Sequence, residues 1–195
     1  MQTNIVKITR NNANLSKILD EAQKTAVYAE LDAKQTFKVT LIAEELVGML
    51  NELSENFEGT FYIEANNRSF KFVTQISLNE NMDKQTKRKF IDISSEKKNA
   101  SAKGIMGKIR DVVENMLYPE NALYSSNFVA YQLETAVLLD DTWTLNRYKD
   151  SQRENEEAWD ELEKSIIANL ADDVIVSVKG TNVEIVIMKT FGSAN

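Results

Sequence analysis

The chain has 195 residues, of which 43% are hydrophobic and 27% are charged, and its formal net charge is −7. This length and apolar content suffice for one folded domain with a sizeable core, which argues against intrinsic disorder. Because the chain contains neither Cys nor His, it cannot form disulfides, zinc, haem or iron–sulfur sites built on those residues, a Cys nucleophile or a Ser-His-Asp triad. The negative charge disfavours general affinity for nucleic acid or anionic lipid.

The distribution of apolar residues along the chain indicates in which cellular compartment the protein is expected. The segment MQTNIVKITRN lacks the apolar run of a signal peptide, and no stretch of about eighteen apolar residues is present to span a membrane. We therefore expect a cytoplasmic protein without a membrane partner, in a reducing compartment.

The first part of the chain predicts a strand and two helices. Alternation of apolar and polar residues over 4–9 indicates a short strand, and Asn12 or Asn14 is placed to cap the helix that follows. After a break at Leu31-Asp32, a second helix is predicted from about residue 33 to residue 53. Its apolar stripe consists of Val39, Ile42, Leu46, Met49, Leu50 and Leu53.

Two hairpins are predicted, one in each half of the chain. The first pairs residues 60–65 with 69–76, after a connection that Gly59 is expected to end. The second pairs residues 173–178 with 183–189. The turn signals are Asn66-Asn67-Arg68 and Lys179-Gly180-Thr181-Asn182.

The segment between the hairpins is predicted to be polar and helical. A polar stretch covers residues 79–103, and helices are predicted at 101–119, 127–139 and 144–170. Within residues 84–110 there are nine basic and two acidic residues, so this part of the chain is strongly positive although the whole is negative. Such a segment could bind a polyanion, or it could be a solvated stretch that pairs with the protein's own acidic helix.

The order strand, two helices, hairpin, helices, hairpin predicts an α+β fold. We expect a two-layer α/β sandwich whose mixed, mostly antiparallel sheet is covered by helices on one face. The whole chain, 1–195, is predicted to form a single domain, in which residues 78–156 are a helical and basic insertion.

Three stretches of the sequence resemble a known family. They are LIAEELVGML at residues 41–50, the strand pair within residues 59–76, and ADDVIVSVKGTNVEIVIMK at residues 171–189. Together with the order of elements, they resemble the histidine-kinase-like ATPase domain of the GHKL type, and most of all the bacterial anti-sigma-factor serine kinases. The resemblance implies the histidine-kinase-like ATPase fold.

The resemblance also assigns roles on the second helix. In the family this helix presents a Glu that serves as general base and, four residues later, an Asn that coordinates Mg²⁺. The matching positions are Glu45 and Met49, and a thioether does not suit Mg²⁺, which prefers oxygen ligands. Without the resemblance, Glu45 reads as part of the solvated face of an amphipathic helix. The family's Asp-x-Gly-x-Gly box, whose Asp binds adenine, is replaced by QISLNENMDK at residues 75–84, so the implied ATP and Mg²⁺ site is degenerate.

Two Gly-containing segments could contact phosphates. KGIMGK at residues 103–108 lies at a predicted helix start, where backbone amides and Lys side chains suit an anion, although its Gly residues could equally serve close helix packing. The Gly-Thr pair of the closing turn follows from the resemblance. The candidate nucleotide-binding residues are Lys103, Gly104, Gly107, Lys108, Gly180 and Thr181. The acidic pairs Asp140-Asp141 and Asp172-Asp173 have no spacing that requires a metal, and we predict no metal ligand.

The resemblance implies a regulatory domain of the anti-sigma-kinase type that binds a protein partner, such as a regulator of transcription or signalling, and carries a degenerate ATP site. One alternative is an active ATP-binding serine kinase that uses Glu45 as its base. A second alternative is a polyanion or nucleic-acid binder that uses residues 84–110. Because only Phe90 interleaves with these basic residues, stacking on bases is disfavoured. Whether the protein is an enzyme and whether it forms a homodimer are left open.

Overall fold

The computed structural model describes residues 1–9, 14–53, 57–78, 108–109, 112–113, 142–153, 159, 162 and 165–192. The elements in chain order are β1 (Val6–Thr9), α1 (Leu15–Tyr28), α2 (Ala33–Leu53), β2 (Phe57–Asn66), β3 (Ser69–Leu78), β4 (Thr142–Thr144), α7 (Leu145–Ser151), α9 (Ile166–Leu170), β5 (Asp173–Lys179) and β6 (Asn182–Thr190). The polar stretch predicted at 79–103 and the helix predicted at 127–139 lie outside the described residues.

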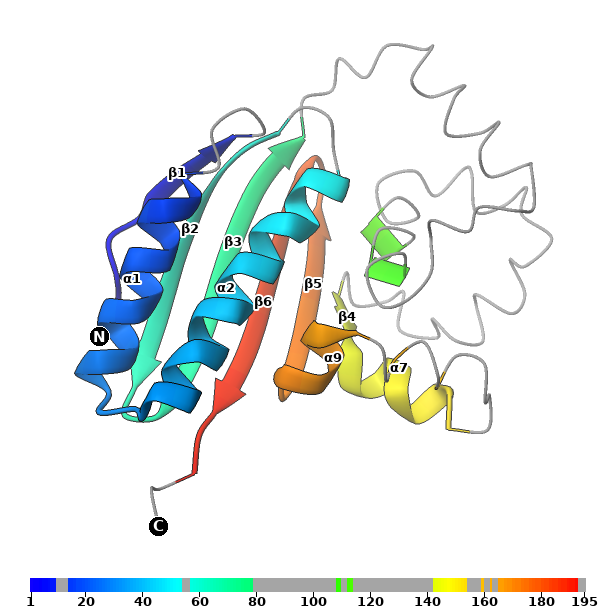
Figure 1. Ribbon diagram of the computed structural model, residues 1–195. Coiled ribbons are helices and arrows are strands. Elements are labelled where there is room, and N and C mark those ends of the chain that lie inside the picture. Colours follow the sequence, from blue (N-terminus) through cyan, green and yellow to red (C-terminus); the bar gives the residue numbers. More distant parts are fainter. Residues whose placement is uncertain are drawn as a thin grey trace, which may run out of the picture.

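The six strands form one sheet in the order β1-β2-β3-β6-β5-β4, and every pairing between them is antiparallel. Figure 1 shows α1, α2 and α9 on the same side of this sheet, with α7 beside the edge strand β4. The predicted α+β class is therefore confirmed, with the helices over one face. The sheet is antiparallel in all its described pairs, whereas a mixed sheet was expected.

The core lies between the sheet and the helices. One row of cross-strand partners runs through Val6, Phe61, Thr74, Ile185 and Val176, and each of these side chains is buried. Because side chains alternate between the two faces of a strand, the residues next to them point to the opposite face. The helices supply the other half of the core. The stripe predicted on α2 is buried at Val39, Ile42, Leu46, Met49 and Leu50.

The helix predicted at 144–170 is not continuous: the described residues 145–151, 159, 162 and 166–170 are helical, but a turn follows at 152–153 and Ser165 precedes a separate helix. Residues 142–144 form the edge strand β4, in which Trp143 is the partner of Val176 in β5 and extends the apolar core. Thr144 then caps α7, since its Oγ1 accepts a hydrogen bond from the Arg147 amide at 3.3 Å. Ser165 caps the separate short helix α9 in the same way, through the Ala168 amide. Of the helix predicted at 101–119, residues 108–109 and 112–113 are described, and they are helical.

The two hairpins are confirmed, although Gly59 was misplaced in the connection. Gly59 lies inside β2 opposite Ile76, and a Cβ atom at this position would lie 2.3 Å from the Gln75 carbonyl oxygen. Both turns consist of two residues whose first member has a positive φ, 53° at Asn67 and 60° at Gly180. Asn and Gly tolerate this left-handed conformation, which explains their presence at the turns.

Asn14 precedes α1, as predicted, but its side chain does not cap the helix. Its φ is 48°, and its amide Nδ2 donates to the Lys7 carbonyl oxygen at 2.7 Å. That carbonyl belongs to the edge strand β1, so Asn14 connects the helix layer to the sheet. For Asn14 the physical reason is this competing backbone acceptor, which no local sequence pattern reveals, and Asn12, the other predicted cap, lies outside the described residues.

Polar contacts at the other end of the helix layer hold α1 and α2 against the first hairpin. Asp32 and Gln35 form a capping box at the start of α2, with hydrogen bonds of 2.7 and 3.3 Å between each side chain and the other residue's amide. From the β2–β3 turn, the Arg68 guanidinium donates to the Gln35 side chain and to the Glu30 carbonyl oxygen. These contacts set the position of α2, the helix that carries the predicted catalytic residue.

Candidate functional site

The helix α2 carries the predicted base and the position of the predicted metal ligand. Glu45 is half-buried, and the preceding Glu44 is exposed. One turn further, Met49 is 1% exposed and belongs to the apolar core cluster. The position that the resemblance assigns to a Mg²⁺ ligand is thus occupied by a buried thioether, a soft donor that does not suit this cation.

Apolar side chains from the later part of the chain pack into the same core as α2. Ile109, Val112, Val113 and Leu162 are all buried and join the cluster that contains Met49. The helix α9 contacts α2 and adds the buried Ile167 to the cluster. Close packing of this kind excludes water and polar ligands from the space that the side chains fill.

Of the predicted phosphate-binding segment 103–108, residues Lys103, Gly104 and Gly107 lie outside the described residues. The described Lys108 is half-buried, and its Nζ lies 5.3 Å from the centroid of the Tyr148 ring in α7. That ring in turn lies 5.9 Å from the ring of Trp143, measured between centroids. The Lys108 ammonium is therefore engaged with an aromatic face, an interaction that stabilises a cation.

Gly180 and Thr181 form the tight turn between β5 and β6. The turn requires the positive φ of Gly180, so the residue types at this position have a structural reason of their own. Their neighbours Lys179 and Asn182 are the last and first residues of the two strands and are exposed. The predicted site residues thus lie on three separate elements: Glu45 on α2, Lys108 facing α7, and the Gly-Thr pair at the end of the sheet.

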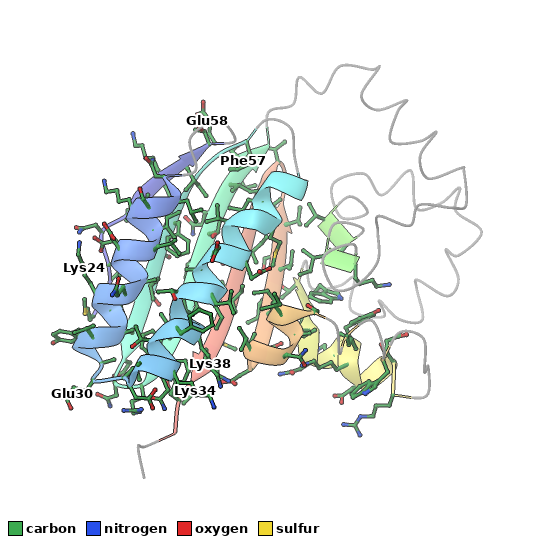
Figure 2. All side chains as sticks on the ribbon, viewed as in Figure 1. Lys24, Glu30, Lys34, Lys38, Phe57 and Glu58 are labelled. Carbon is green, nitrogen blue, oxygen red and sulfur yellow. The ribbon has the colours of Figure 1, made fainter. Side chains whose placement is uncertain are left out.

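The sheet has a hollow of about 470 Å³ at the end where β5 turns into β6. We refer to it as the hollow, and its lining residues are Glu58, Gly59, Gln75, Ile76, Ser77, Ser177, Lys179, Asn182, Val183 and Glu184. They come from β2, β3, β6 and β5. In Figure 2, Glu58 marks this end of β2, and Lys34 and Lys38 mark the first turns of α2 at the opposite end of the molecule.

The polar side chains of the hollow belong to the face of the sheet that points away from α1 and α2. Gln75, Glu184 and Ser177 are cross-strand partners, and so are Ser77 and Asn182. These residues alternate with the core residues along each strand and so project to the opposite face. Sequence reasoning missed the hollow because it is assembled from four strands. The alternation of polar residues in the two predicted hairpins was the only available signal.

The hollow is negatively charged. It contains two carboxylates, Glu58 and Glu184, against one ammonium group, Lys179. Glu184 accepts a hydrogen bond of 2.7 Å from the Gln75 side-chain amide. The charge reaches beyond the hollow, since the pKa of Tyr62 is raised above its ordinary value, mainly by burial and further by the carboxylates of Glu64 and Glu184.

The acidic pair before β5 serves local structure. Asp172 accepts hydrogen bonds from the Lys189 ammonium at 2.7 Å and from the Thr190 amide at 2.6 Å. Asp173 accepts from the Asn146 amide in the first turn of α7. Within the described residues, no three acidic side chains gather as a metal site would require.

None of the helices that the structure describes has the length and apolar character needed to cross a membrane.

Comparison with known proteins gives no relative, since no family model, no curated protein and no solved structure matches the chain.

Proposed function

We propose that this chain is a regulatory protein-binding domain built on a degenerate histidine-kinase-like ATPase scaffold, most similar to that of the anti-sigma-factor serine kinases. The order of elements supports this scaffold: a strand, two helices and a hairpin precede a helical region and a closing hairpin. Helices on one face of the sheet and a Gly180-Thr181 turn between the closing strands also agree with the resemblance.

The observation that carries the functional part of the proposal is the burial of Met49. In the family the corresponding residue must face the nucleotide with an oxygen atom, whereas Met49 faces the apolar core and is 1% exposed. The thioether of Met49 is a poor ligand for a hard cation such as Mg²⁺. Without a bound cation, the negative charge of a triphosphate is not neutralised, and this weakens nucleotide binding. The scaffold is then left with partner binding as its activity.

The kinase alternative is supported by one feature, the half-buried Glu45 one turn before Met49. A general base of this type would accept a proton from the attacking hydroxyl group. The test compares phosphate release from ATP, with Mg²⁺ or Mn²⁺, by the full chain and by Glu45→Ala. The proposal predicts no release above the buffer background for either protein. Release that disappears in Glu45→Ala, with an unchanged melting temperature, would contradict the proposal and favour the kinase alternative, because it shows that Glu45 activates a nucleophile toward ATP.

A further inference from the structure

The face of the sheet opposite α1 and α2 carries a continuous apolar row. Tyr62, Val73, Val186 and Ile175 are successive cross-strand partners in β2, β3, β6 and β5, and we call them the apolar row. The helices α1, α2 and α9 lie over the other face (Figure 1). Val73 is 5% exposed, and the other three members are partly exposed. On the face of an antiparallel sheet that does not pack against helices, such positions are usually polar, so this row departs from the usual alternation.

The hollow adjoins the apolar row directly. Gln75, Glu184 and Ser177 are each two residues from a member of the row on the same strand, and they form the next row on the same face. An apolar strip and a polar hollow are therefore side by side across β3, β6 and β5. A flat solvated sheet face would not have this combination, which suits a ligand with one apolar and one polar part.

The charges of the hollow define that polar part. In the described part of the chain, neither Glu58 nor Glu184 forms an ion pair, and the hydrogen bond to Glu184 comes from the neutral amide of Gln75. Glu58 lies on β2 and Glu184 on β6, with β3 between them. Glu58 is in register with Ser77 and Asn182, and Glu184 lies two residues further along β6, so the two backbones are about 12 Å apart, two strand spacings across and two residues along. A cation above Ser77 of β3 can therefore be reached by both carboxylates.

We infer that the apolar row and the hollow together bind a segment of a partner protein that presents an Arg or Lys beside an aliphatic or aromatic side chain. The cation enters the hollow between Glu58 and Glu184, and the apolar side chain packs on Val186 and Ile175. This inference rests on the proposed function and deepens it, because it names the surface and the chemistry of the partner. Carboxylates that hold a guanidinium from two sides give specificity as well as affinity.

The test is a nuclear magnetic resonance titration of the isotope-labelled full chain with two blocked peptides. The basic probe is acetyl-Leu-Arg-Leu-Arg-Leu-amide, and the matched acidic probe is acetyl-Leu-Glu-Leu-Glu-Leu-amide. We expect the basic peptide to shift the backbone amides of Gly59, Ser77 and Asn182 and the side-chain amide of Gln75. The acidic peptide should leave these signals in place.

Substitutions test the role of the two carboxylates. Glu58→Gln combined with Glu184→Gln keeps the side-chain shapes and removes both charges, and it should raise the Kd of the basic peptide at least about tenfold. The matched control is Glu44→Gln, which removes an exposed carboxylate from α2 in the helix layer. It should leave the Kd within about twofold, the range expected for a remote surface charge.

Any of four results would overturn the inference. In the first three, the amide signals do not shift at millimolar basic peptide, they shift equally with both peptides, or the shifts are confined to α1 and α2. The fourth result is a shift of the same amide signals when the protein concentration alone changes, which would make a second copy of the chain the occupant. ATP with Mg²⁺ added to the same sample separates the two proposals. Shifts of the α2 amides around Glu45 would contradict the proposed function. The absence of a response to the basic peptide would contradict only the inference that the apolar row and the hollow bind a basic segment.

Discussion

Two fully buried threonines differ in whether their hydroxyl groups have a partner. Thr25 on α1 donates from Oγ1 to the Glu21 carbonyl oxygen at 2.7 Å. Thr74 on β3 lies between Phe61 and Ile185 in the core row, and its Oγ1 has no hydrogen-bond partner in the described structure. A buried hydroxyl without a partner opposes folding, because it gives up its hydrogen bonds to water.

Substitution by Val, which has nearly the same shape, should therefore act in opposite directions at the two positions. Thr74→Val should raise the free energy of unfolding by about 1 kcal/mol, since it removes an unsatisfied group. Thr25→Val should lower the free energy of unfolding by about 1 kcal/mol, since the substitution removes the hydrogen bond to the Glu21 carbonyl oxygen. Urea unfolding of both variants measures the difference. A loss of stability in Thr74→Val as large as that in Thr25→Val would show that the Thr74 hydroxyl has a partner.

Met49 allows a direct test of whether its position is core or binding site. Met49→Leu keeps an apolar side chain of similar volume and should change the free energy of unfolding by less than about 1.5 kcal/mol. Met49→Asn introduces the residue type that the resemblance expects, and in the apolar core it should lower stability by about 3 kcal/mol. The same urea unfolding measures both. An Asn tolerated within about 1 kcal/mol would mean that this position faces water or polar groups.

At the scale of elements, two glycines illustrate opposite reasons for the absence of a side chain. Gly59 lies in β2, where an added Cβ would meet the Gln75 carbonyl oxygen at 2.3 Å. Gly48 lies on the exposed side of α2, and nothing lies within 4 Å of an added Cβ. The strand position requires Gly on steric grounds, whereas the helix position does not.

Alanine substitution should separate the two cases. Gly59→Ala should lower the free energy of unfolding by about 2 kcal/mol, because the backbone of β3 must move away. Gly48→Ala should raise it by about 1 kcal/mol, since Ala restricts the unfolded chain and favours helix. Thermal unfolding monitored by circular dichroism follows both changes. Stabilisation by Gly59→Ala would mean that β2 and β3 are not paired in the register described here.

Elements with a strong local pattern could be predicted from the sequence. The apolar stripe of α2 and the alternation of β5 and β6 extend over many residues, so they predict the element and its buried face. The strand β4 has three residues and no period, and its pairing with β5 is a tertiary contact. Residues 142–143 were therefore predicted to belong to no element, and a helix was predicted from about residue 144, because the polar residues that follow favour helix.

The candidate site was less accessible to sequence reasoning. The roles that the resemblance assigns to Glu45 and Met49 stay predictions, whereas the apolar stripe of α2 already indicated that Met49 is buried, as the structure confirms. The hollow could not be predicted, because Glu58 and Glu184 come close only through the order of strands β2, β3 and β6. That order depends on the pairing of β3 with β6, which are more than a hundred residues apart in the sequence.

At the scale of the whole molecule, the pairing of β3 with β6 unites the two halves of the chain in one sheet. Cross-strand partners extend from Ser69 and Thr190 at one end to Ser77 and Asn182 at the other. Core residues from both halves join a single apolar cluster. The two faces of the sheet then have different roles: one packs against helices, and the other presents the apolar row and the hollow.

We propose a domain that binds a protein partner and does not bind ATP with Mg²⁺. Calorimetric titration of the full chain with ATP and with a non-hydrolysable analogue, each with and without Mg²⁺, tests this proposal. We expect no binding heat up to millimolar nucleotide under any of these conditions, since the Met49 thioether does not suit the cation. Micromolar binding that requires Mg²⁺ would contradict the proposal and would favour the kinase alternative, with Glu45 as the base.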